Sequence, residues 1–400
     1  MSRMFEGLKV IDCGSFIAAP LAATLLGDFG ADVIKVEPPG AGDPYRHVHK
    51  MPGMPQSEQA YNWLLDNRGK RGLALDLGKA EGQAVLHKLA AGADVFITNY
   101  PLAVRGKLGL DTERICALNE RLIYASFTGY GETGGEVNKP GFDLTAYWAR
   151  SGLMDMVRTD AGAPPARAVT GMGDHPSGNS LFAAILLALY QRERTGRGAQ
   201  VGSSLLANGL WSNGVMAQAA LCGATFTPRP PREKLLNALS AYYRCGDGRW
   251  LVLVIVNEAR DWPAFAKCMD HAELVDDPRF ATQADRFRRS AELIAIFDAA
   301  FATRDREDWR QRLDEAGVVF ECVAEMADLP KDRQMLDAGV LVPFEDDATL
   351  TIDSPLYVAG IEKSKPRKPP ALGEHSDAIL REAGYDDSAI AQLREARIVA

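Results

Sequence analysis

Short apolar runs alternate with helical stretches through the first half of the chain, and this alternation constrains the fold more than any other feature. Several runs have the length and composition of buried strands: 8–12, 33–37, 73–77, 95–98 and 122–127. Helices are expected between them, over 18–27, 79–91 and 112–118. Strands interleaved with helices predict an α/β fold with a mainly parallel sheet covered on both faces.

The regular pattern fails between Tyr130 and Gly178, where glycine and proline recur. A strongly apolar helix is then expected over 179–194, a strand over 199–203 and a second helix over 205–221. Long irregular stretches inside a compact domain are more often functional than accidental. The irregular stretch is therefore a candidate region for functional residues.

The composition changes at Thr225–Pro231, which we interpret as a stiff linker. Residues 242–256 predict a hairpin that turns at Gly246–Gly248. Further helices are expected over 262–269, 291–303 and 306–316. We expect a smaller α+β domain over 225–325. The C-terminal tail has too few apolar residues to form a hydrophobic core of its own, so we expect it to return to the first domain, which gives a discontinuous large domain of 1–224 and 326–400.

The charge balance disfavours two classes of partner. With 45 Lys and Arg against 53 Asp and Glu, the 400-residue chain carries a formal charge of −8, so we expect no nucleic acid or acidic lipid partner. An anionic ligand must then meet local basic groupings, and three are visible: Arg46 with His47, Arg68 with Lys70 and Arg71, and Lys107 with Lys139. Each alone is more often a solvated surface. The segment 67–72 is the densest and favours a phosphate-bearing cosubstrate.

The six cysteines are scattered, without a C-x-x-C pair or a cysteine and histidine cluster at zinc spacing. We expect no metal site, and free thiols in a reducing compartment. The N-terminus is polar and passes directly into a strand, which predicts no signal or transit peptide. A mean hydropathy of −0.14 indicates no membrane span, so a cytoplasmic location is expected.

The loop from Asp12 to Pro20 follows the first strand, where a doubly wound fold places a nucleotide. It lacks G-x-G-x-x-G, however, and Glu37 at the end of the second strand is then only a weak sign of ribose binding. No Gly-x-Ser-x-Gly, Walker or His-Glu-x-x-His motif occurs. Dehydrogenase, hydrolase, kinase and metalloprotease functions are therefore not supported.

Asp174 is the residue that local context singles out. It lies in a glycine-framed turn, Thr170–Gly178, that leads into an apolar helix. Glycines let a ligand approach the backbone closely and leave amide N–H groups free to stabilise an oxyanion. Two interpretations stay open, a catalytic carboxylate and a helix-capping aspartate. We interpret the adjacent His175 as a bystander.

Short blocks along nearly the whole chain carry a family resemblance. They are Gly7–Asp12, Ala19–Pro20, Leu26–Glu37, Lys70–Asp76, Ala93–Val95, Asn99–Tyr100, Arg121–Ala125, Gly129–Gly131, Pro140–Asp143, Thr195–Gly198 and Leu372–Ser376. Together these blocks are highly specific, although each is weak alone. The chain resembles the class III CoA-transferases, whose superfamily also holds the α-methylacyl-CoA racemases.

The resemblance implies a Rossmann-like large domain, a small domain, and a homodimer whose two chains interlock like rings. It also implies that Asp174 is the nucleophile. The carboxylate would attack an acyl-CoA thioester to give an acyl-aspartyl anhydride, and the returning thiolate would give an aspartyl-CoA thioester. A small carboxylic acid then collects the CoA, which is a cosubstrate rather than a tightly bound cofactor.

The positions that match the CoA-binding residues of the family are Ile17, Ala18, Leu75, Asp76, Asn99, Tyr100, Lys107 and Lys139. Lysines are suitable point charges for the CoA phosphates. Some positions depart from the formyl-CoA transferase pattern: Pro38 replaces a basic residue, Ile17 replaces a glutamine, and no glycine-rich lid lies between Thr225 and Tyr242. A formyl or oxalyl substrate is therefore not expected.

Phe142 distinguishes the transferase from its rival within the superfamily. The racemases place a histidine there, since removing and returning an α-proton on opposite faces takes two bases. Phenylalanine cannot act as a base, so Phe142 favours a CoA-transferase over a racemase. A 2-methylacyl-CoA racemase or epimerase, and an inactive CoA-binding homologue, remain as alternatives. An apolar rim would suit an acyl group larger than formyl, although core roles stay open for its members Phe16, Ile17, Phe142, Tyr147 and Trp148.

Overall fold

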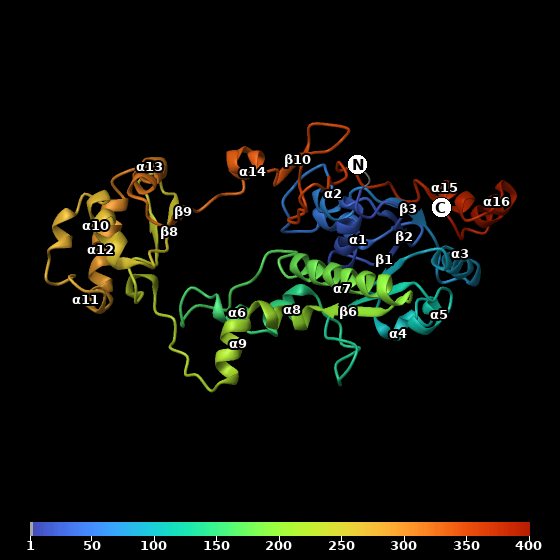
Figure 1. Ribbon diagram of the computed structural model, residues 1–400, viewed down its shortest axis with the longest axis horizontal. Coiled ribbons are helices and arrows are strands. Elements are labelled where there is room, and N and C mark those ends of the chain that lie inside the picture. Colours follow the sequence, from blue (N-terminus) through green and yellow to red (C-terminus); the bar gives the residue numbers. More distant parts are fainter. Residues whose placement is uncertain (1–2) are drawn as a thin grey trace. The chain divides into compact units, whose positions relative to one another are not determined.

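The computed structural model describes residues 3–400 and divides the chain into two compact units (Figure 1). The first unit contains the described residues up to Asp155 together with Arg167–Cys222 and Arg333–Ala400, and the second contains Met156–Ala166 and Gly223–Asp332. The segment Met156–Ala166, which the sequence analysis placed in the large domain, thus belongs to the second unit. Hydrogen bonds from Ala161 N to Arg229 O and from Arg229 to Arg158 O join it to the linker.

A six-stranded sheet forms the centre of the first unit. Its strands are β1 (Lys9–Cys13), β2 (Asp32–Glu37), β3 (Arg71–Ala74), β4 (Val95–Thr98), β5 (Ile123–Thr128) and β6 (Gln200–Ser204). They lie in the order β3-β2-β1-β4-β5-β6 and every neighbouring pair is parallel. The predicted parallel α/β sheet is confirmed, and the strand order is that of a Rossmann-like domain. The order reverses between β1 and β4, and ligands of such folds bind beside that point at the carboxyl ends of the strands.

Successive residues of a strand point to opposite faces of the sheet. Both faces are buried, because each is covered by a separate core. Val10 and Val95 pack in one core with α1 (Ala18–Asp28) and α7 (Asp174–Thr195). These two helices approach closely at Gly178, where a Cβ atom would lie 2.7 Å from the carbonyl oxygen of Ala18. The close approach fixes the beginning of α7 against the beginning of α1.

The other face is covered partly by the C-terminal end of the chain. The core there includes Ile11 and Phe96, with α3 (Ala80–Ala91), α15 (Ser376–Glu382) and α16 (Asp387–Glu395). The red helices α15 and α16 lie beside the blue-green α3 in Figure 1. The tail therefore returns to the first unit.

The first unit has several shorter elements. They are η1 (Pro44–Lys50), α2 (Tyr61–Asp66), α4 (Leu102–Arg105), α5 (Thr112–Cys116), the π-helix η2 (Asp143–Ala149), α8 (Leu205–Ser212), α9 (Gly214–Leu221), α14 (Arg333–Asp337), β10 (Leu341–Pro343) and β11 (Leu350–Ile352). The single helix predicted over 205–221 is wrong: α8 and α9 divide at Asn213, whose side chain donates to Ser151 O. A further short helix, α6 (Leu153–Met156), crosses the boundary between the units.

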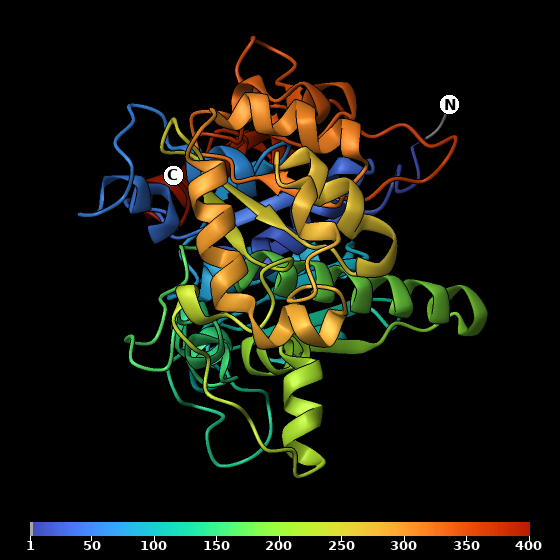
Figure 2. The ribbon, with the colours of Figure 1, turned by 90° about the vertical axis from the view of Figure 1, so that its left-hand side faces the viewer.

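The second unit contains a small antiparallel sheet of β7 (Tyr242–Arg244), β8 (Trp250–Leu253) and β9 (Phe320–Cys322). The predicted hairpin is confirmed, with Gly248 at a φ of +83° in its turn. The helices are α10 (Glu258–Cys268), α11 (Gln283–Arg288), α12 (Ser290–Phe301) and α13 (Arg306–Ala316), and short 3-10 turns are η3 (Arg232–Lys234), η4 (Ala272–Val275) and η5 (Leu329–Lys331). Figure 2 shows these helices in yellow and orange. The ring of Phe301 lies 4.9 Å from Tyr243 and 4.8 Å from Trp309 in the core.

Candidate active site

Asp174 is the first residue of α7, directly after Gly173 at the N-cap. The helix begins five residues earlier than predicted, because a proline in the first turn, here Pro176, removes no helical hydrogen bond. Within residues 3–400, the half-buried carboxylate of Asp174 accepts no hydrogen bond. The capping interpretation is therefore wrong, because the side chain makes no capping hydrogen bond.

The turn before Asp174 is held by the π-helix η2. One carboxylate oxygen of Asp143, Oδ2, accepts hydrogen bonds from the backbone N–H groups of Gly171 at 3.1 Å and Gly173 at 3.4 Å. Gly171 has a φ of +82°, and a Cβ atom at Gly173 would lie 2.7 Å from the ring of Tyr147. The glycines are thus needed for a tight turn. Their N–H groups are engaged by Asp143, so the expectation that they are free for an oxyanion is wrong.

The electrostatic surroundings of Asp174 disfavour its charged form. Burial, followed by the negative charge of Asp143, raises the pKa of Asp174 to about 7, while His175 lowers it and Asp66 raises it. A carboxylic acid with such a pKa is partly protonated at neutral pH. Perturbed groups of this kind are concentrated at functional sites.

His175, interpreted above as a bystander, contacts a buried carboxylate. Its Nε2 atom lies 3.0 Å from Oδ1 of Asp66, which is fully buried at the end of α2. The second oxygen of Asp66 accepts a 2.6 Å hydrogen bond from the Tyr45 hydroxyl. No local motif indicated this pairing, since 109 positions separate His175 from Asp66. The pairing itself could be found only from the folded chain.

Buried ion pairs fill the carboxyl ends of β1 and β2. Lys70 Nζ lies 2.8 Å from Asp12 Oδ2, and Lys35 Nζ lies 3.0 Å from Asp43 Oδ2. All four side chains are buried. Such groups stay charged in the interior because each meets an opposite charge and hydrogen bonds. The pairs stabilise the loop that leads from β1 into α1, where Lys35 also donates to Gly14 O.

The basic residues of the segment 67–72 are neutralised within the protein, which corrects the phosphate-binding expectation for them. In addition to the pairing of Lys70, Arg68 binds Asp28 and Arg71 binds Asp32 and Glu382. The same holds for Glu37, whose two carboxylate oxygens accept hydrogen bonds of 2.7 Å from Arg46. Glu37 is therefore not available to hold a ribose.

Three of the positions matched to CoA binding lie at the switch point of the sheet. Asn99, directly after β4, accepts a hydrogen bond from Ser15 N at 2.8 Å and donates to Ser15 O at 2.7 Å. Ile17 precedes α1, and its side chain lies near Gly171 of the Asp174 turn. Ala18 is the first residue of α1 and is buried. The structure thus brings Ile17 and Ala18 close to the turn of the candidate nucleophile, while Asn99 holds the loop that precedes them.

Leu75, Asp76 and Lys107 form a second group. Gln83 connects the two segments that carry these residues. Its side-chain amide donates hydrogen bonds of 2.9 Å to the carbonyl oxygen of Leu77, which follows Asp76, and to that of Lys107. The side chain of Asp76 accepts from Gly78 N, Leu75 is buried, and Lys107 is exposed. An exposed lysine can reach a phosphate in solvent.

Tyr100 and Lys139 have contacts of a different kind. Tyr100 is half-buried after Asn99, and burial is the main cause that raises its hydroxyl pKa. Lys139 binds Glu136 at 2.7 Å and lies over the Tyr130 ring at 5.0 Å. The contacts of Lys139 are thus within its own loop, and within residues 3–400 none of them joins it to Lys107.

The aromatic residues expected at an apolar rim separate into two sets. Tyr147 and Trp148 are buried core residues, whereas Phe142 is 61% exposed and its ring lies 5.6 Å from that of Phe16. Phe16 has a φ of +61°, a strained left-handed conformation for a bulky residue. The backbone N–H of Phe16 is held by Asp43. The loop therefore presents the Phe16 ring toward Phe142 at a conformational cost.

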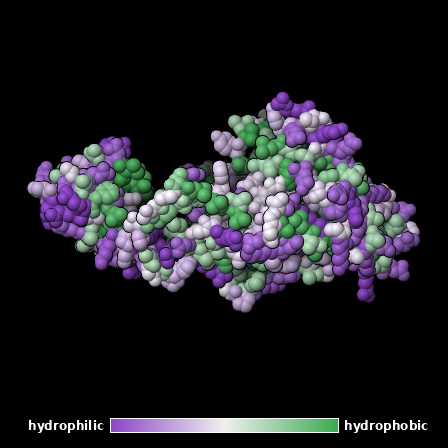
Figure 3. Space-filling model, turned by 90° about the horizontal axis from the view of Figure 1, so that it is seen from below, coloured by the Kyte–Doolittle hydropathy of each residue, from purple (hydrophilic) through white to green (hydrophobic). Residues whose placement is uncertain are grey.

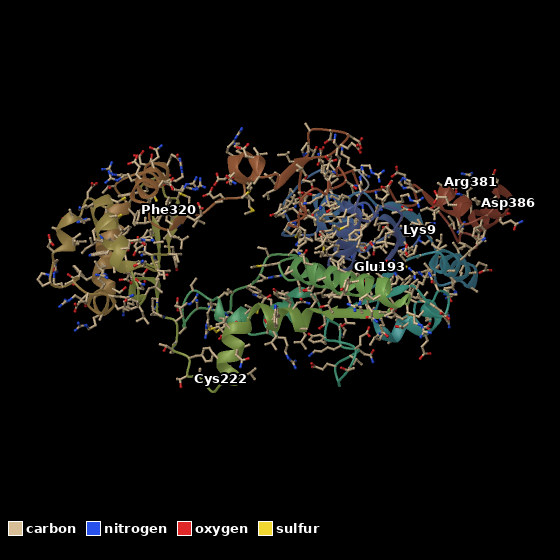
Figure 4. The ribbon with its side chains drawn as sticks, viewed as in Figure 1. Lys9, Glu193, Cys222, Phe320, Arg381 and Asp386 are labelled. Carbon is tan, nitrogen blue, oxygen red and sulfur yellow. The ribbon has the colours of Figure 1, made fainter. Side chains whose placement is uncertain are left out.

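The site lies at one end of α7, and different residues mark the other end. Figure 4 labels Lys9 at the start of β1 and Glu193 in the last turns of α7. There, Asp94 accepts hydrogen bonds from Lys9 N and from Arg192.

Within residues 3–400 no group of three or more His, Cys, Asp or Glu side chains could hold a metal ion. No helix in that same range is long and apolar enough to cross a membrane.

Comparisons with known proteins agree on one family. Residues 5–376 match the CoA-transferase family III. The chain is 32% identical to the (R)-2-hydroxy-4-methylpentanoate CoA-transferase of Clostridioides difficile, over 99% of both chains. It is 30% identical to the cinnamoyl-CoA:phenyllactate CoA-transferase of Clostridium sporogenes, over 98% of this chain and 97% of that one. The crystal structure of a CAIB/BAIF family protein from Brucella suis superposes with a TM-score of 0.85 at 29% identity, covering 96% of this chain and 100% of the other.

Proposed function

The chain belongs to CoA-transferase family III and is a CoA-transferase, and we propose that it transfers CoA between an acyl-CoA and a carboxylic acid through covalent attachment at Asp174. The observation that carries this proposal is the carboxylate of Asp174, which is half-buried and accepts no hydrogen bond within residues 3–400. It lies beside the switch point of the sheet, where ligands of this fold bind.

In the first step, a carboxylate oxygen of Asp174 attacks the thioester carbonyl carbon. A C–O bond forms, the C–S bond breaks, and CoA thiolate leaves with the electron pair. The thiolate then attacks the aspartyl carbonyl of the anhydride, which gives an aspartyl-CoA thioester and releases the donor acid. The acceptor carboxylate then attacks the aspartyl carbonyl of the thioester, which breaks the C–S bond and gives a second anhydride and CoA thiolate. The thiolate attacks the acyl carbonyl that came from the acceptor, which breaks the C–O bond to Asp174, forms the new acyl-CoA and regenerates the Asp174 carboxylate. Splitting the transfer in this way replaces one difficult step by easier ones.

We place CoA along the carboxyl ends of the strands. Ile17 and Ala18 lie near the Asp174 turn, where the thioester must reach, and Asn99 binds the loop that precedes them. The group of Leu75, Asp76 and Lys107 lies further along the sheet edge, and the exposed Lys107 ammonium would meet the phosphates. Tyr100 and Lys139 complete the proposed set.

We propose an acyl group that is branched or aromatic. Phe142 immediately precedes Asp143, which holds the nucleophile turn, and its exposed ring contacts Phe16. Two apolar rings beside the turn favour a hydrophobic acyl chain. The two relatives described above are named for substrates of this chemical kind, 2-hydroxy-4-methylpentanoate in one and cinnamoyl-CoA with phenyllactate in the other.

We propose that the enzyme is a homodimer, in the interlocked form that the family resemblance implies. Helices α8 and α9 expose Trp211 at 86%, Val215 at 77% and Leu221 at 80%. Apolar side chains are interspersed with polar ones on the face seen in Figure 3. Exposed apolar surface of this kind supports a protein interface. Light scattering coupled to gel filtration would give the mass, and a monomer at micromolar concentration would refute the dimer.

The experiment that tests the mechanism is trapping with hydroxylamine. Incubation with 4-methylpentanoyl-CoA and hydroxylamine is expected to convert Asp174 to its hydroxamate, identified by peptide mass spectrometry. Asp174→Asn should lose about a thousandfold or more of the transfer rate. Asp387→Asn is the matched control, because Asp387 is likewise the first residue of a helix but is 83% exposed. Full activity of Asp174→Asn would refute the proposal.

A further inference from the structure

Hydrogen bonds bring residues of four elements together around the beginning of α7. Tyr45 comes from η1, Asp66 from α2, Asp143 from η2 and His175 from α7. Tyr45 donates to one oxygen of Asp66 at 2.6 Å, and His175 Nε2 lies 3.0 Å from the other. The result is a continuous chain, Tyr45–Asp66–His175, that ends next to the nucleophile.

Asp66 fixes the orientation and the charge of His175. Tyr45 is buried, and burial together with Asp66 raises its hydroxyl pKa, so it remains a neutral donor. Asp66 is then a buried carboxylate that needs a positive partner. Burial lowers the pKa of His175, but the hydrogen bond and charge of Asp66, with the charge of Asp174 and the Gly171 carbonyl, raise it overall. These contacts therefore favour the imidazolium form of His175.

The nucleophile needs this positive charge. Asp174 faces the carboxylates of Asp143 and Asp66, and within residues 3–400 it has no hydrogen-bond donor of its own. Of the charged groups that act on it, His175 is the one that favours the carboxylate form. Asp143 cannot be removed without cost, since it holds the glycine turn.

We propose that His175, oriented by Asp66 and Tyr45, is the positioning residue of this enzyme, and that it supplies the positive charge beside Asp174 before the thioester is attacked. His175 keeps its proton throughout. It does not protonate the leaving thiolate, which must stay nucleophilic for its return. This inference rests on the proposed function, because it assigns His175 a task in the reaction of Asp174.

The test is the pH dependence of kcat/KM for the full-length enzyme. In His175→Gln the acid limb is expected to move upward by about one pH unit, which lowers the rate about tenfold at pH 6 and restores it near pH 9. His175→Arg keeps a positive charge that can pair with Asp66, so its acid limb should not move upward. The matched control is His271→Gln, because His271 also contacts a carboxylate, Glu273 at 2.8 Å, in the second unit.

Two results would overturn the inference: an unchanged acid limb in His175→Gln, or a loss of rate that is equal at every pH. If the Gln variant does not fold, an upward shift in a folded His175→Arg overturns it instead. Hydroxylamine trapping at pH 9 separates the two proposals. A hydroxamate at Asp174 in wild type with an unchanged His175→Gln profile refutes only the role of His175, whereas no hydroxamate in wild type refutes the nucleophile.

Discussion

The carboxylate of Asp143 accepts a hydrogen bond of 3.1 Å from the backbone N–H of Gly171. This contact joins the π-helix η2 to the turn that precedes α7. It also places a second negative charge near Asp174, where it contributes to the raised pKa. The same side chain thus shapes the turn and makes the nucleophile harder to ionise.

Replacing Asp143 by Asn should separate these two effects. Asparagine keeps an acceptor oxygen for Gly171 but removes the charge, so the pKa of Asp174 should fall. The acid limb of kcat/KM is expected to move downward by about one pH unit. This direction is opposite to the one expected for His175→Gln. An acid limb that stays in place would show that the charge of Asp143 does not act on Asp174.

The pKa of Asp174 also predicts how stability depends on pH. Its value of about 7 in the folded state exceeds the ordinary value of 3.8, so the folded protein binds the proton more tightly. The resulting stabilisation is complete below about pH 4 and is lost as the pH rises through 7. Asp174→Asn, which does not ionise, should be more stable than wild type at pH 8, by at most about 4 kcal/mol, and by less where solvent screens the partly exposed carboxylate.

Urea unfolding at pH 8 and at pH 4 measures this difference. The free energies of unfolding of wild type and Asp174→Asn should differ at pH 8 and converge at pH 4. Asp387→Asn, at an exposed helix start, should show no such divergence. Equal stabilities at pH 8 would contradict the burial of the Asp174 carboxylate.

Lys70 is expected to be essential to the stability of the first unit. Lys70→Met removes the cation that lies 2.8 Å from buried Asp12, and leaves Asp12 with Lys35 at 3.8 Å. Breaking a buried pair from one side costs about 3–5 kcal/mol. The control Lys368→Met removes an exposed partner of Asp347 and should cost about 1 kcal/mol or less. Similar losses in chemical denaturation for both variants would contradict this expectation.

Gly178→Ala tests the contact between α1 and α7. The new methyl group would lie 2.7 Å from Ala18 O and 2.8 Å from the Leu21 side chain, so the helices must separate. Overpacking of this kind costs about 1–3 kcal/mol and should lower the Tm. In Gly214→Ala, also in a helix, the methyl group meets nothing within 4 Å. The Tm of that variant should be unchanged or raised, and a similar loss in both would contradict the prediction.

The sequence predicted the elements that depend on local periodicity. The strand over 95–98 was predicted with its observed bounds, and the parallel sheet follows from the alternation of strands and helices. Helix α13 was likewise predicted over 306–316. Asp174 also stood out locally, because glycine-framed turns are encoded by neighbouring residues. Its proposed role, however, came from the family resemblance.

The partners of these residues were decided by the tertiary structure alone. The basic run at 67–72 looked like a phosphate site, but folding brings Asp28 to Arg68 and Asp12 to Lys70. His175 looked unimportant until α2 placed Asp66 beside it. The physical reason is that periodicity reports which face of an element is buried, whereas an ion pair or a pKa depends on charges that only the packed chain brings together. The chain's sequence thus determined the sheet, its helices and the candidate nucleophile, and its tertiary structure decided the charge around that nucleophile.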